Sequence, residues 1–261
     1  MMLRAFSTAA TGMNAQQMMV DVIANNLANI NTSGFKRSQV DFQDLLYITM
    51  QAPGSEVGTG TIAPGGVEVG SGVRAAATVK VFTQGELQNT GNNLDCAIQG
   101  DGFFMVTTPG GEARYTRDGS FFRSADGNLV TASGYMLSPS ISIPADVVDV
   151  NIAQDGTVNG RSADGVVTVG RIQMARFSNP SGLSSEGGNL LAETPASGAP
   201  VLGNPGENGL GVIQSGFLEK SNVQMVMELV NLITAQRAYE INSRAIRAGD
   251  DMLRDANQLV R

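Results

Sequence analysis

Four aspartates are the residues whose type and spacing come closest to a catalytic arrangement. Asp95, Asp101, Asp118 and Asp126 each lie beside a predicted turn, and glycoside hydrolysis uses a pair of such carboxylates. No spacing singles out one pair, and aspartates in turns ordinarily face solvent. We therefore expect solvated turn residues and not an acid–base pair.

Two glycine-containing segments resemble ligand-binding loops only in part. Residues 69–72, VGSG, contain Gly-x-Gly but lack the third glycine and the following helix of a dinucleotide site. Residues 126–128, DGN, lack the alternating ligands and terminal glutamate of a calcium loop, so a hairpin turn is the better interpretation. Neither a Walker-type Gly-Lys-Ser/Thr loop nor a Gly-x-Ser-x-Gly elbow occurs. No cofactor and no metal are expected.

Histidine is absent from the sequence. This excludes Ser-His-Asp and Cys-His catalysis, histidine-based zinc sites and the usual general base near neutral pH. The single cysteine, Cys96, alternates with Leu94 and Ile98 on one face of a predicted strand and has no basic neighbour. We expect it to be buried and unreactive, and the sequence gives no support to an enzyme.

Charge and hydropathy further restrict the class of protein. The net charge is −7, and the 17 basic residues are scattered along the sequence. Non-specific nucleic-acid binding needs a concentrated basic patch. Nucleic acid is therefore not an expected partner. The N-terminus lacks the basic and apolar regions of a signal peptide. No run of about 18 apolar residues occurs, so the protein is not expected to be membrane-inserted.

Two long helices are predicted at the ends of the chain. In the first, over residues 3–30, an apolar row with one polar member recurs at helical spacing: Leu3, Phe6, Ala10, Met13, Gln17, Val20, Ala24 and Leu27. A second row widens this face: Met2, Ala9, Ile23 and Ile30. Turn formers place the end of the helix near Asn31, with Gly34 in the left-handed conformation.

The C-terminal helix is predicted from about Asn222 to Leu259 and would be about 57 Å long. One row reads Leu229, Leu232, Gln236, Tyr239, Ser243, Ile246, Asp250 and Leu253; another reads Ala238, Ile241, Ala245, Ala248, Met252 and Leu259. So long a pattern favours a coiled coil. The second row packs either on the chain's own β region or on helices of other subunits, and the length favours other subunits. Head-to-tail contacts that do not close into a ring generate an open helical filament.

Between the helices the pattern is that of β-structure. Apolar residues alternate, and Asp-Gly pairs at 118–119, 126–127, 155–156 and 164–165 predict hairpin turns. The sequence thus predicts an α+β fold, with long terminal helices forming a coiled-coil-like domain and a β-rich central domain. The helical part comprises residues 1–46 and 217–261, an extended loop or linker covers 47–72, and the β-rich domain covers 73–216.

Four segments resemble the flagellar basal-body rod and hook protein family. They are AATGMNAQQMMVDVIANNLANINTSGFKRSQVDFQDLLY (9–47), LQNTGNNLDCAIQGDGFFMV (87–106), YTRDGSFFRSADGNLVTASGY (115–135) and GFLEKSNVQMVMELVNLITAQRAYEINSRAI (216–246). Their occurrence together and in order, over nearly the whole chain, is highly specific. The length, residues 47–74 and residues 208–223 most resemble distal rod members. A proximal rod or hook subunit is the near alternative, and a periplasmic carbohydrate-binding or hydrolytic β protein is the distant one.

The resemblance implies a structural subunit that polymerises into a hollow helical drive shaft, transmits torque and lines an export channel. Both termini would form an inner coiled coil, the β domain an outer layer, and residues 47–66 would stiffen the rod. Expected partners are further copies of the chain, proximal rod and hook proteins or adaptors, the basal-body rings and the flagellar type III export apparatus. The expected location is the periplasm-spanning rod of the basal body, reached without cleavage of a signal peptide.

The residues expected at the subunit interface lie on both helices and just after the first. They are Leu3, Phe6, Met13, Val20, Asn26, Leu27, Asn29, Phe35, Leu229, Leu232, Tyr239, Ile246 and Leu253. Asn26 and Asn29 are expected to specify the register between subunits, because a misaligned amide loses its partner. The alternative is that they are exposed polar residues near a helix end. Phe35 is expected to anchor the chain as it leaves the helix.

Overall fold

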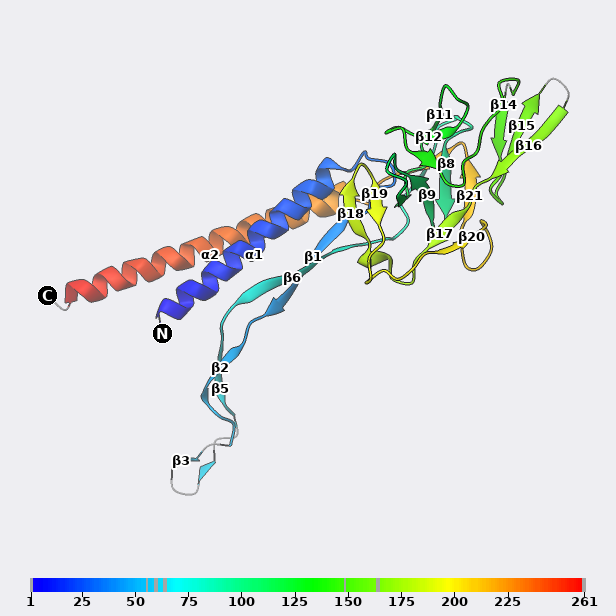
Figure 1. Ribbon diagram of the computed structural model, residues 1–261. Helices are drawn as coiled ribbons and strands as arrows, with labels where there is room; N and C mark the ends of the chain where they lie inside the picture. The colour runs from blue at the N-terminus through cyan, green and yellow to red at the C-terminus, as the bar shows by residue number, and fades with distance from the viewer. Residues whose placement is uncertain are drawn as a thin grey trace. The chain divides into compact units, whose positions relative to one another are not determined.

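The computed structural model describes residues 2–54, 56–58, 61–62, 65–147, 149–162 and 165–259 (Figure 1). The chain forms two compact units. Unit 1 comprises residues 1–27, 38–79 and 224–261, and unit 2 comprises residues 28–37 and 80–223. The chain therefore enters and leaves unit 2 twice, through segments around residues 28, 37, 80 and 223.

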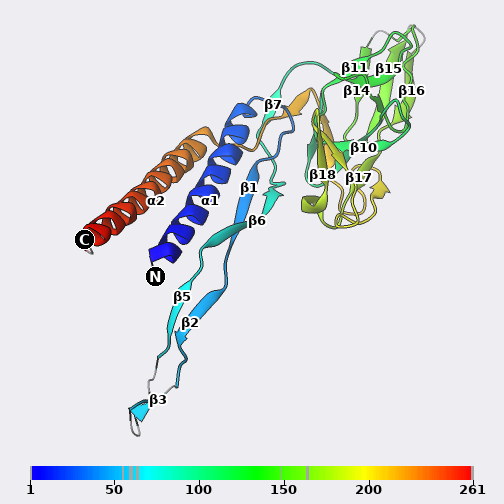
Figure 2. The ribbon, with the colours of Figure 1, turned by 60° about the vertical axis from the view of Figure 1, so that its left-hand side comes forward.

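Unit 1 contains two helices and a long β-hairpin. Helices α1 (Met2–Ala28) and α2 (Met225–Leu259) lie side by side in both views (Figures 1 and 2). Three strand pairs build the hairpin: β1 (Ser38–Asp44) with β6 (Val73–Lys80), β2 (Tyr47–Gln51) with β5 (Val67–Gly70), and β3 (Glu56–Gly58) with β4 (Thr61–Ile62). The predicted helical ends and β-rich middle, and with them the α+β class, are confirmed.

Residues 47–72 differ from the extended loop that their composition predicts. The described part supplies β2 and β5, which pair antiparallel with Ile48 opposite Val69 and Tyr47 opposite Gly70. Pairing gives the backbone amides and carbonyls that face the other strand a partner that an isolated extended chain would lack. Residues 55, 59–60 and 63–64 of the predicted loop lie outside the described residues.

The end of α1 follows the predicted turn chemistry. The helix ends at Ala28, and Gly34 adopts a φ of +68°, as predicted. A Cβ atom at Gly34 would lie 2.6 Å from the carbonyl carbon of Arg117, so glycine is required by space as well as by conformation.

Unit 2 is built from short strands. These are β7 (Leu87–Asn89), β8 (Cys96–Gln99), β9 (Phe103–Thr107), β10 (Ala113–Thr116), β11 (Phe121–Arg123), β12 (Leu129–Thr131), β13 (Met136–Leu137), β14 (Asp149–Ile152), β15 (Thr157–Ser162), β16 (Gly165–Arg171), β17 (Met174–Arg176), β18 (Ser184–Gly187), β19 (Leu190–Ala192), β20 (Val201–Gly203), β21 (Val212–Ser215) and β22 (Phe217–Glu219), with one short 3-10 helix, η1 (Pro180–Gly182). The largest sheet has the order β11-β12-β13-β9-β10-β19-β18, with β17 pairing to β9 and β20. Smaller sheets are β14-β15-β16, β21-β8 and β22-β7.

The Asp-Gly signals are correct at some turns and wrong at one. Gly127 and Gly156 take positive φ in the turns between β11 and β12 and between β14 and β15. The pair at 164–165 begins at a residue outside the described ones. Asp118-Gly119 joins β10 to β11, which are not neighbours in the sheet, so the predicted hairpin is wrong there. Glycine at 119 instead allows the backbone to pass close to the Cys96 carbonyl oxygen, which a Cβ atom there would overlap.

The core of unit 2 lies on both faces of the strands around β9, because successive side chains of a strand point to opposite faces. Phe104 packs in the larger cluster, edge-on to Phe121 at 5.1 Å between ring centroids. Phe103 packs on the other face, against Phe177. Cys96 has no exposed surface and lies in the larger cluster beside Leu94, as predicted, and burial raises its pKa to about 12.

Candidate assembly surface

Small residues allow α1 and α2 to pack closely. A Cβ at Gly12 would lie 2.9 Å from Asn242 Nδ2, and a Cβ at Gly249 would lie 2.8 Å from Phe6 Cζ. Ala235 in the same row of α2 is fully buried. Residues 235, 242 and 249 are seven apart, which is the spacing of a coiled-coil seam. The seam of α2 is therefore a row of small and polar residues.

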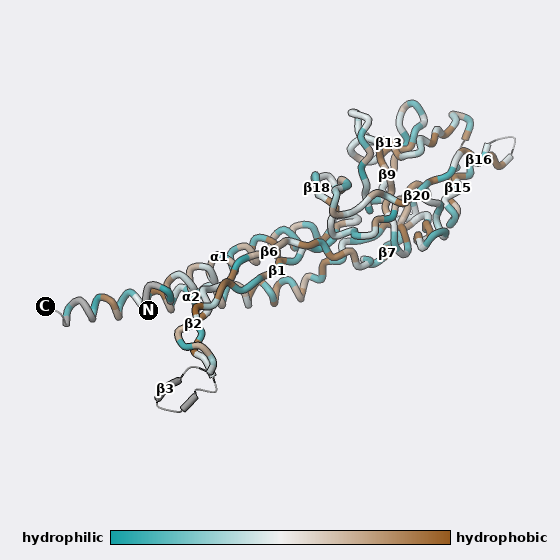
Figure 3. The backbone as a smooth tube through the Cα atoms, turned by 60° about the horizontal axis from the view of Figure 1, so that its bottom comes forward, coloured by the Kyte–Doolittle hydropathy of each residue, from teal (hydrophilic) through white to brown (hydrophobic). Residues whose placement is uncertain are grey.

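Large aliphatic side chains of α2 lie on a different face. Val226, Val230, Ile233 and Ile241, here called the α2 stripe, are each more than half exposed. At 100° per residue the stripe lies about 140° around the helix axis from the seam. Apolar and polar residues alternate along the tube of both helices (Figure 3). The stripe is thus an apolar surface, interrupted by the exposed Arg237 between Ile233 and Ile241, that unit 1 itself leaves uncovered.

Asn26 joins α1 to the first strand. Its Nδ2 donates to the Ser38 carbonyl at 2.8 Å, and its Oδ1 accepts from the Ser38 amide at 2.9 Å. The side chain is only 1% exposed. Both hydrogen-bonding groups of the amide are therefore used within the chain. Within the chain, Asn26 thus fixes β1 against α1, and its predicted role in the register between subunits stays a prediction.

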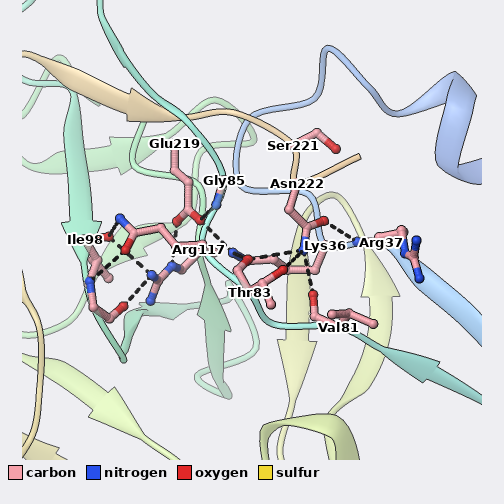
Figure 4. A network of polar contacts seen from close by, with 12 residues as sticks. Lys36, Arg37, Val81, Thr83, Gly85, Ile98, Arg117, Glu219, Ser221 and Asn222 are labelled. Atoms are coloured by element: carbon pink, nitrogen blue, oxygen red, sulfur yellow. Dashed lines mark hydrogen bonds and ion pairs between the residues drawn. The ribbon is translucent and has the colours of Figure 1, made fainter. Parts of the chain in front are cut away.

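A buried ionic network lies in unit 2 (Figure 4). Glu219 Oε1 accepts from Lys36 Nζ at 2.6 Å and from the Gly85 amide at 2.8 Å, and Oε2 accepts from Arg117 Nε at 2.7 Å. Burial opposes ionisation of Glu219, but the charges of Arg117 and Lys36 outweigh it and hold the carboxyl pKa below its usual range. The carboxylate therefore stays charged without any exposure of its side chain.

Arg117 and Asn222 extend this network along the backbone. Arg117 also donates to the carbonyls of Gly100, Gly102 and Ile98. Asn222 Oδ1 accepts from the Arg37 amide at 2.7 Å, and its Nδ2 donates to the Val81 carbonyl at 2.8 Å. The network thus ties together three of the four segments by which the chain enters and leaves unit 2, those around residues 37, 80 and 223.

The turn aspartates do not form a catalytic pair. Asp95 is buried and accepts from Thr90 Oγ1 at 2.6 Å and Asn92 Nδ2 at 3.1 Å, so the prediction that it is solvated is wrong. Asp118 accepts from the Ser120 amide at 3.1 Å. Asp101 and Asp126 are exposed. Among the described residues, no group of three or more Cys, Asp or Glu side chains is placed to hold a metal ion.

Three protein families match successive parts of the sequence. The family described as flagella basal body rod protein matches residues 6–36, the flagellar hook protein FlgE/F/G D1 domain matches residues 97–160, and the flagellar basal body rod FlgEFG protein C-terminal family matches residues 214–259. The first and last of these contain most of α1 and α2, and the second lies within unit 2.

Full-length relatives carry the same description. The flagellar basal-body rod protein FlgG of Buchnera aphidicola subsp. Baizongia pistaciae is 46% identical over 99% of this chain and 100% of its own length. That of Borreliella burgdorferi is 45% identical over 100% of both chains, and that of Caulobacter vibrioides is 47% identical over 98% of this chain and 99% of its own. This chain belongs to the flagellar basal-body rod protein family.

Membership of this family fixes the class of function. The chain is a structural subunit of the flagellar basal-body rod and not an enzyme, as predicted. A rod family implies that its members polymerise within the basal body. In the described part of the chain, neither helix has the length and apolar character that crossing a membrane requires.

The rod protein places its predicted interface residues in different surroundings. Phe6, Met13, Val20, Leu27, Asn29, Phe35, Leu232, Ile246 and Leu253 are half-buried, Leu229 and Tyr239 are exposed, and Asn26 is buried. The side chain of Leu3 lies outside the described part of the chain. Of the predicted rows, Ala10, Gln17 and Ala24 of α1 are exposed, as are Gln236 and Asp250 of α2. The rows therefore run along the flank of each helix, beside the seam.

Asn29 and Phe35 contact residues of unit 2. The Asn29 side-chain oxygen accepts from Thr32 Oγ1 at 3.1 Å, which supports the turn after α1. The Phe35 ring lies 5.9 Å below the ammonium of Lys80, a cation–π contact. The sequence assigns no role to Lys36, Arg117 or Glu219. The available signal was Lys36, a charged residue beside Phe35 in the turn after α1.

Proposed function

We propose that the α2 stripe is the surface through which this rod protein contacts neighbouring subunits in a helical polymer. The observation that carries the proposal is the exposure of four aliphatic side chains on the face of α2 turned away from its seam with α1. Burying each contributes about 1.5–3 kcal/mol. A neighbour's helix is the natural cover, because the stripe has helical spacing over four turns.

The contact is proposed to be head-to-tail. A stripe on one side of unit 1 meets a different surface of the next copy, and such contacts generate a helical filament when the rotation between copies does not close a ring. Of the predicted residues exposed on α2, Leu229 lies next to the stripe and is proposed to extend it, and Tyr239 is proposed to make a second contact on another face of the helix. Leu3, Phe6, Met13, Val20 and Leu27 of α1 and Leu232, Ile246 and Leu253 of α2 are proposed to complete it at the helix flanks.

Within the basal body we propose the distal rod as the position, on the resemblance of residues 47–74 and 208–223 to distal rod members. The polymer would be a hollow drive shaft that transmits torque, spans the periplasm and lines the export channel. The subunit would leave the cytoplasm through the flagellar type III export apparatus without cleavage of a signal. Proximal rod and hook proteins or adaptors and the basal-body rings are the proposed neighbours.

The β2–β5 part of the hairpin is proposed to stiffen the rod. Leu46, Tyr47 and Met50 are all largely exposed there, and apolar side chains of this size gain by contact with another subunit. Deleting residues 47–66 is expected to lower the bending stiffness of assembled rods while leaving unit 2 folded. Unchanged stiffness, measured from the curvature of rods in electron micrographs, would remove this role.

A charge placed in the stripe tests the assembly proposal. Ile233→Glu puts a carboxylate in the stripe, and Ile233→Leu, which keeps the side chain apolar and of similar size, is the matched control. We expect Ile233→Glu to abolish rod assembly and motility with normal helical content by circular dichroism, and Ile233→Leu to assemble. Normal rods and motility in Ile233→Glu cells would reject the stripe as the interface.

A further inference from the structure

The ionic network of unit 2 holds more positive than negative charge. Lys36 and Arg117 share one carboxylate, that of Glu219, and their side chains are 3% and 7% exposed. Buried charges are normally paired with opposite charges and hydrogen-bonded. Within the described part of the chain these two buried cations have one carboxylate between them, and backbone carbonyls supply the other acceptors of Arg117.

The Lys36 ammonium also has unused hydrogen-bonding capacity. It donates to the Thr83 carbonyl at 2.8 Å and to Glu219 Oε1, which accounts for two of the three donors of an ammonium. Burial lowers the pKa of Lys36, and attraction to Glu219 offsets only part of this because Arg117 repels the ammonium. An additional anion would supply both the third acceptor and the missing charge.

A cavity of about 220 Å³ lies beside these cations. Lys36, Arg117 and Arg176 contribute its basic lining, and Phe103 and Phe177 contribute aromatic walls. Arg176 is exposed, and within the described ranges its guanidinium makes one long hydrogen bond of 3.4 Å, to the Asn208 carbonyl. A guanidinium held this loosely is available to a ligand.

Asp101 also lines the cavity and is exposed. It forms no ion pair with Lys36, Arg117 or Arg176 among the residues that the structure describes, and these three basic side chains outnumber it in the lining. The cavity thus combines a cationic end with an apolar end formed by rings in edge-on contact, Phe103 with Phe177 at 5.9 Å between centroids.

We propose that this cavity is a binding site for a carboxylate carried on a short hydrocarbon stem. The carboxylate accepts from Lys36 and Arg176, and the stem packs on the rings of Phe103 and Phe177. The aromatic walls favour an organic acid over an inorganic anion, because they offer apolar contact and no donors. The basic end excludes amines of the same shape.

The same chemistry has two sources. One is a glutamate side chain of a second copy, since each chain has 24 acidic against 17 basic residues and so offers carboxylates in excess; this source rests on the proposed polymer. The other is a free short-chain acid. The binding site is tested on the unassembled chain. Its failure is therefore distinct from a failure of the proposed assembly interface, which would appear as normal rods from the Ile233→Glu variant.

Butyrate is the probe for the unassembled full-length chain, with butylammonium as its control of opposite charge. By titration calorimetry we expect butyrate to bind with a Kd on the order of 1 mM, and butylammonium not to bind. Arg176→Gln is expected to weaken butyrate binding about tenfold, as loss of a hydrogen bond to a charged group does. Arg171→Gln, a similarly exposed arginine outside the cavity, is expected to leave it unchanged.

Absence of saturable butyrate binding, equal binding of butylammonium, or equal Kd values for Arg176→Gln and the unchanged chain would each overturn the proposal. Assembled rods then identify the source. Loss of butyrate binding on assembly supports a glutamate of the neighbouring subunit as the occupant. Retention of the same Kd in rods supports a free acid and overturns the neighbour.

Discussion

Glu219 Oε2 accepts a hydrogen bond from Arg117 Nε at 2.7 Å, across 102 residues of sequence and with no exposed surface on the Glu219 side chain. The same carboxylate binds Lys36, 183 residues away. One side chain therefore joins the segment after α1, the segment before α2 and the end of β10. This junction lies beside the points at which the chain leaves unit 2 for β1 and for α2.

Replacing Glu219 is expected to destabilise unit 2 strongly. Glu219→Gln leaves two buried cations without a counter-charge, and breaking a buried pair in this way costs about 3–5 kcal/mol. Glu186→Gln, which breaks the exposed contact with Arg114, is the control and is expected to change the free energy of unfolding little. Urea titration of both variants measures the difference. Equal stability of the two would show that the network contributes nothing.

The same carboxylate predicts how stability depends on pH. The pKa of Glu219 in the folded chain lies below its ordinary value of 4.5. The contribution of the ionised Glu219 to the free energy of unfolding is therefore fully present above pH 4.5. It is lost as the pH falls through the pKa of Glu219 in the folded chain. Urea titrations at decreasing pH are expected to show a fall in unfolding free energy that is smaller in Glu219→Gln. An equal fall of unfolding free energy at low pH in both chains would show that the ionised Glu219 does not stabilise the fold.

Gly34→Ala tests the turn that follows α1. Alanine is strained at a φ of +68°, and its Cβ would lie 2.6 Å from the Arg117 carbonyl carbon. We therefore expect the free energy of unfolding to fall by about 1–3 kcal/mol. Gly110→Ala is the matched control, because its Cβ would meet only Thr108 Oγ1 at 3.8 Å. Thermal unfolding of the two variants is the measurement. A Gly34→Ala chain as stable as Gly110→Ala would mean that the turn tolerates a side chain.

Asn26→Ala tests the contact between α1 and β1. The substitution leaves the Ser38 amide and carbonyl without their partner, at an expected cost of about 1–3 kcal/mol if both stay buried. Hydrogen exchange at the Ser38 amide is expected to accelerate. Asn14→Ala, on the exposed side of α1, is expected to leave that rate unchanged. An unaltered exchange rate of the Ser38 amide in Asn26→Ala would show that Asn26 does not hold β1 against α1.

The sequence predicted those features that depend on neighbouring residues. Helical spacing located α1 and α2, and the turn formers before Gly34 located its left-handed conformation. Alternation with Leu94 and Ile98 placed Cys96 in the core. The sequence did not indicate the Ser38 partner of Asn26 or the partners of Glu219, because these partners are fixed by the fold and have no signature in the surrounding residues. The seam of α2 was also missed, since Ala235, Asn242 and Gly249 are small or polar where the large residues Leu229 and Tyr239 set the apparent row.

The subunit interface can be measured directly with one introduced thiol. Cys96 is the single cysteine, fully buried and with a pKa raised to about 12, so it adds little background to maleimide labelling. Ile241→Cys places a second thiol in the α2 stripe, and the free chain of this variant is its own reference. We predict rapid labelling of Cys at 241 in the free chain and at least tenfold slower labelling in assembled rods. Equal rates in the two states would show that the stripe faces solvent in the rod and would contradict the account.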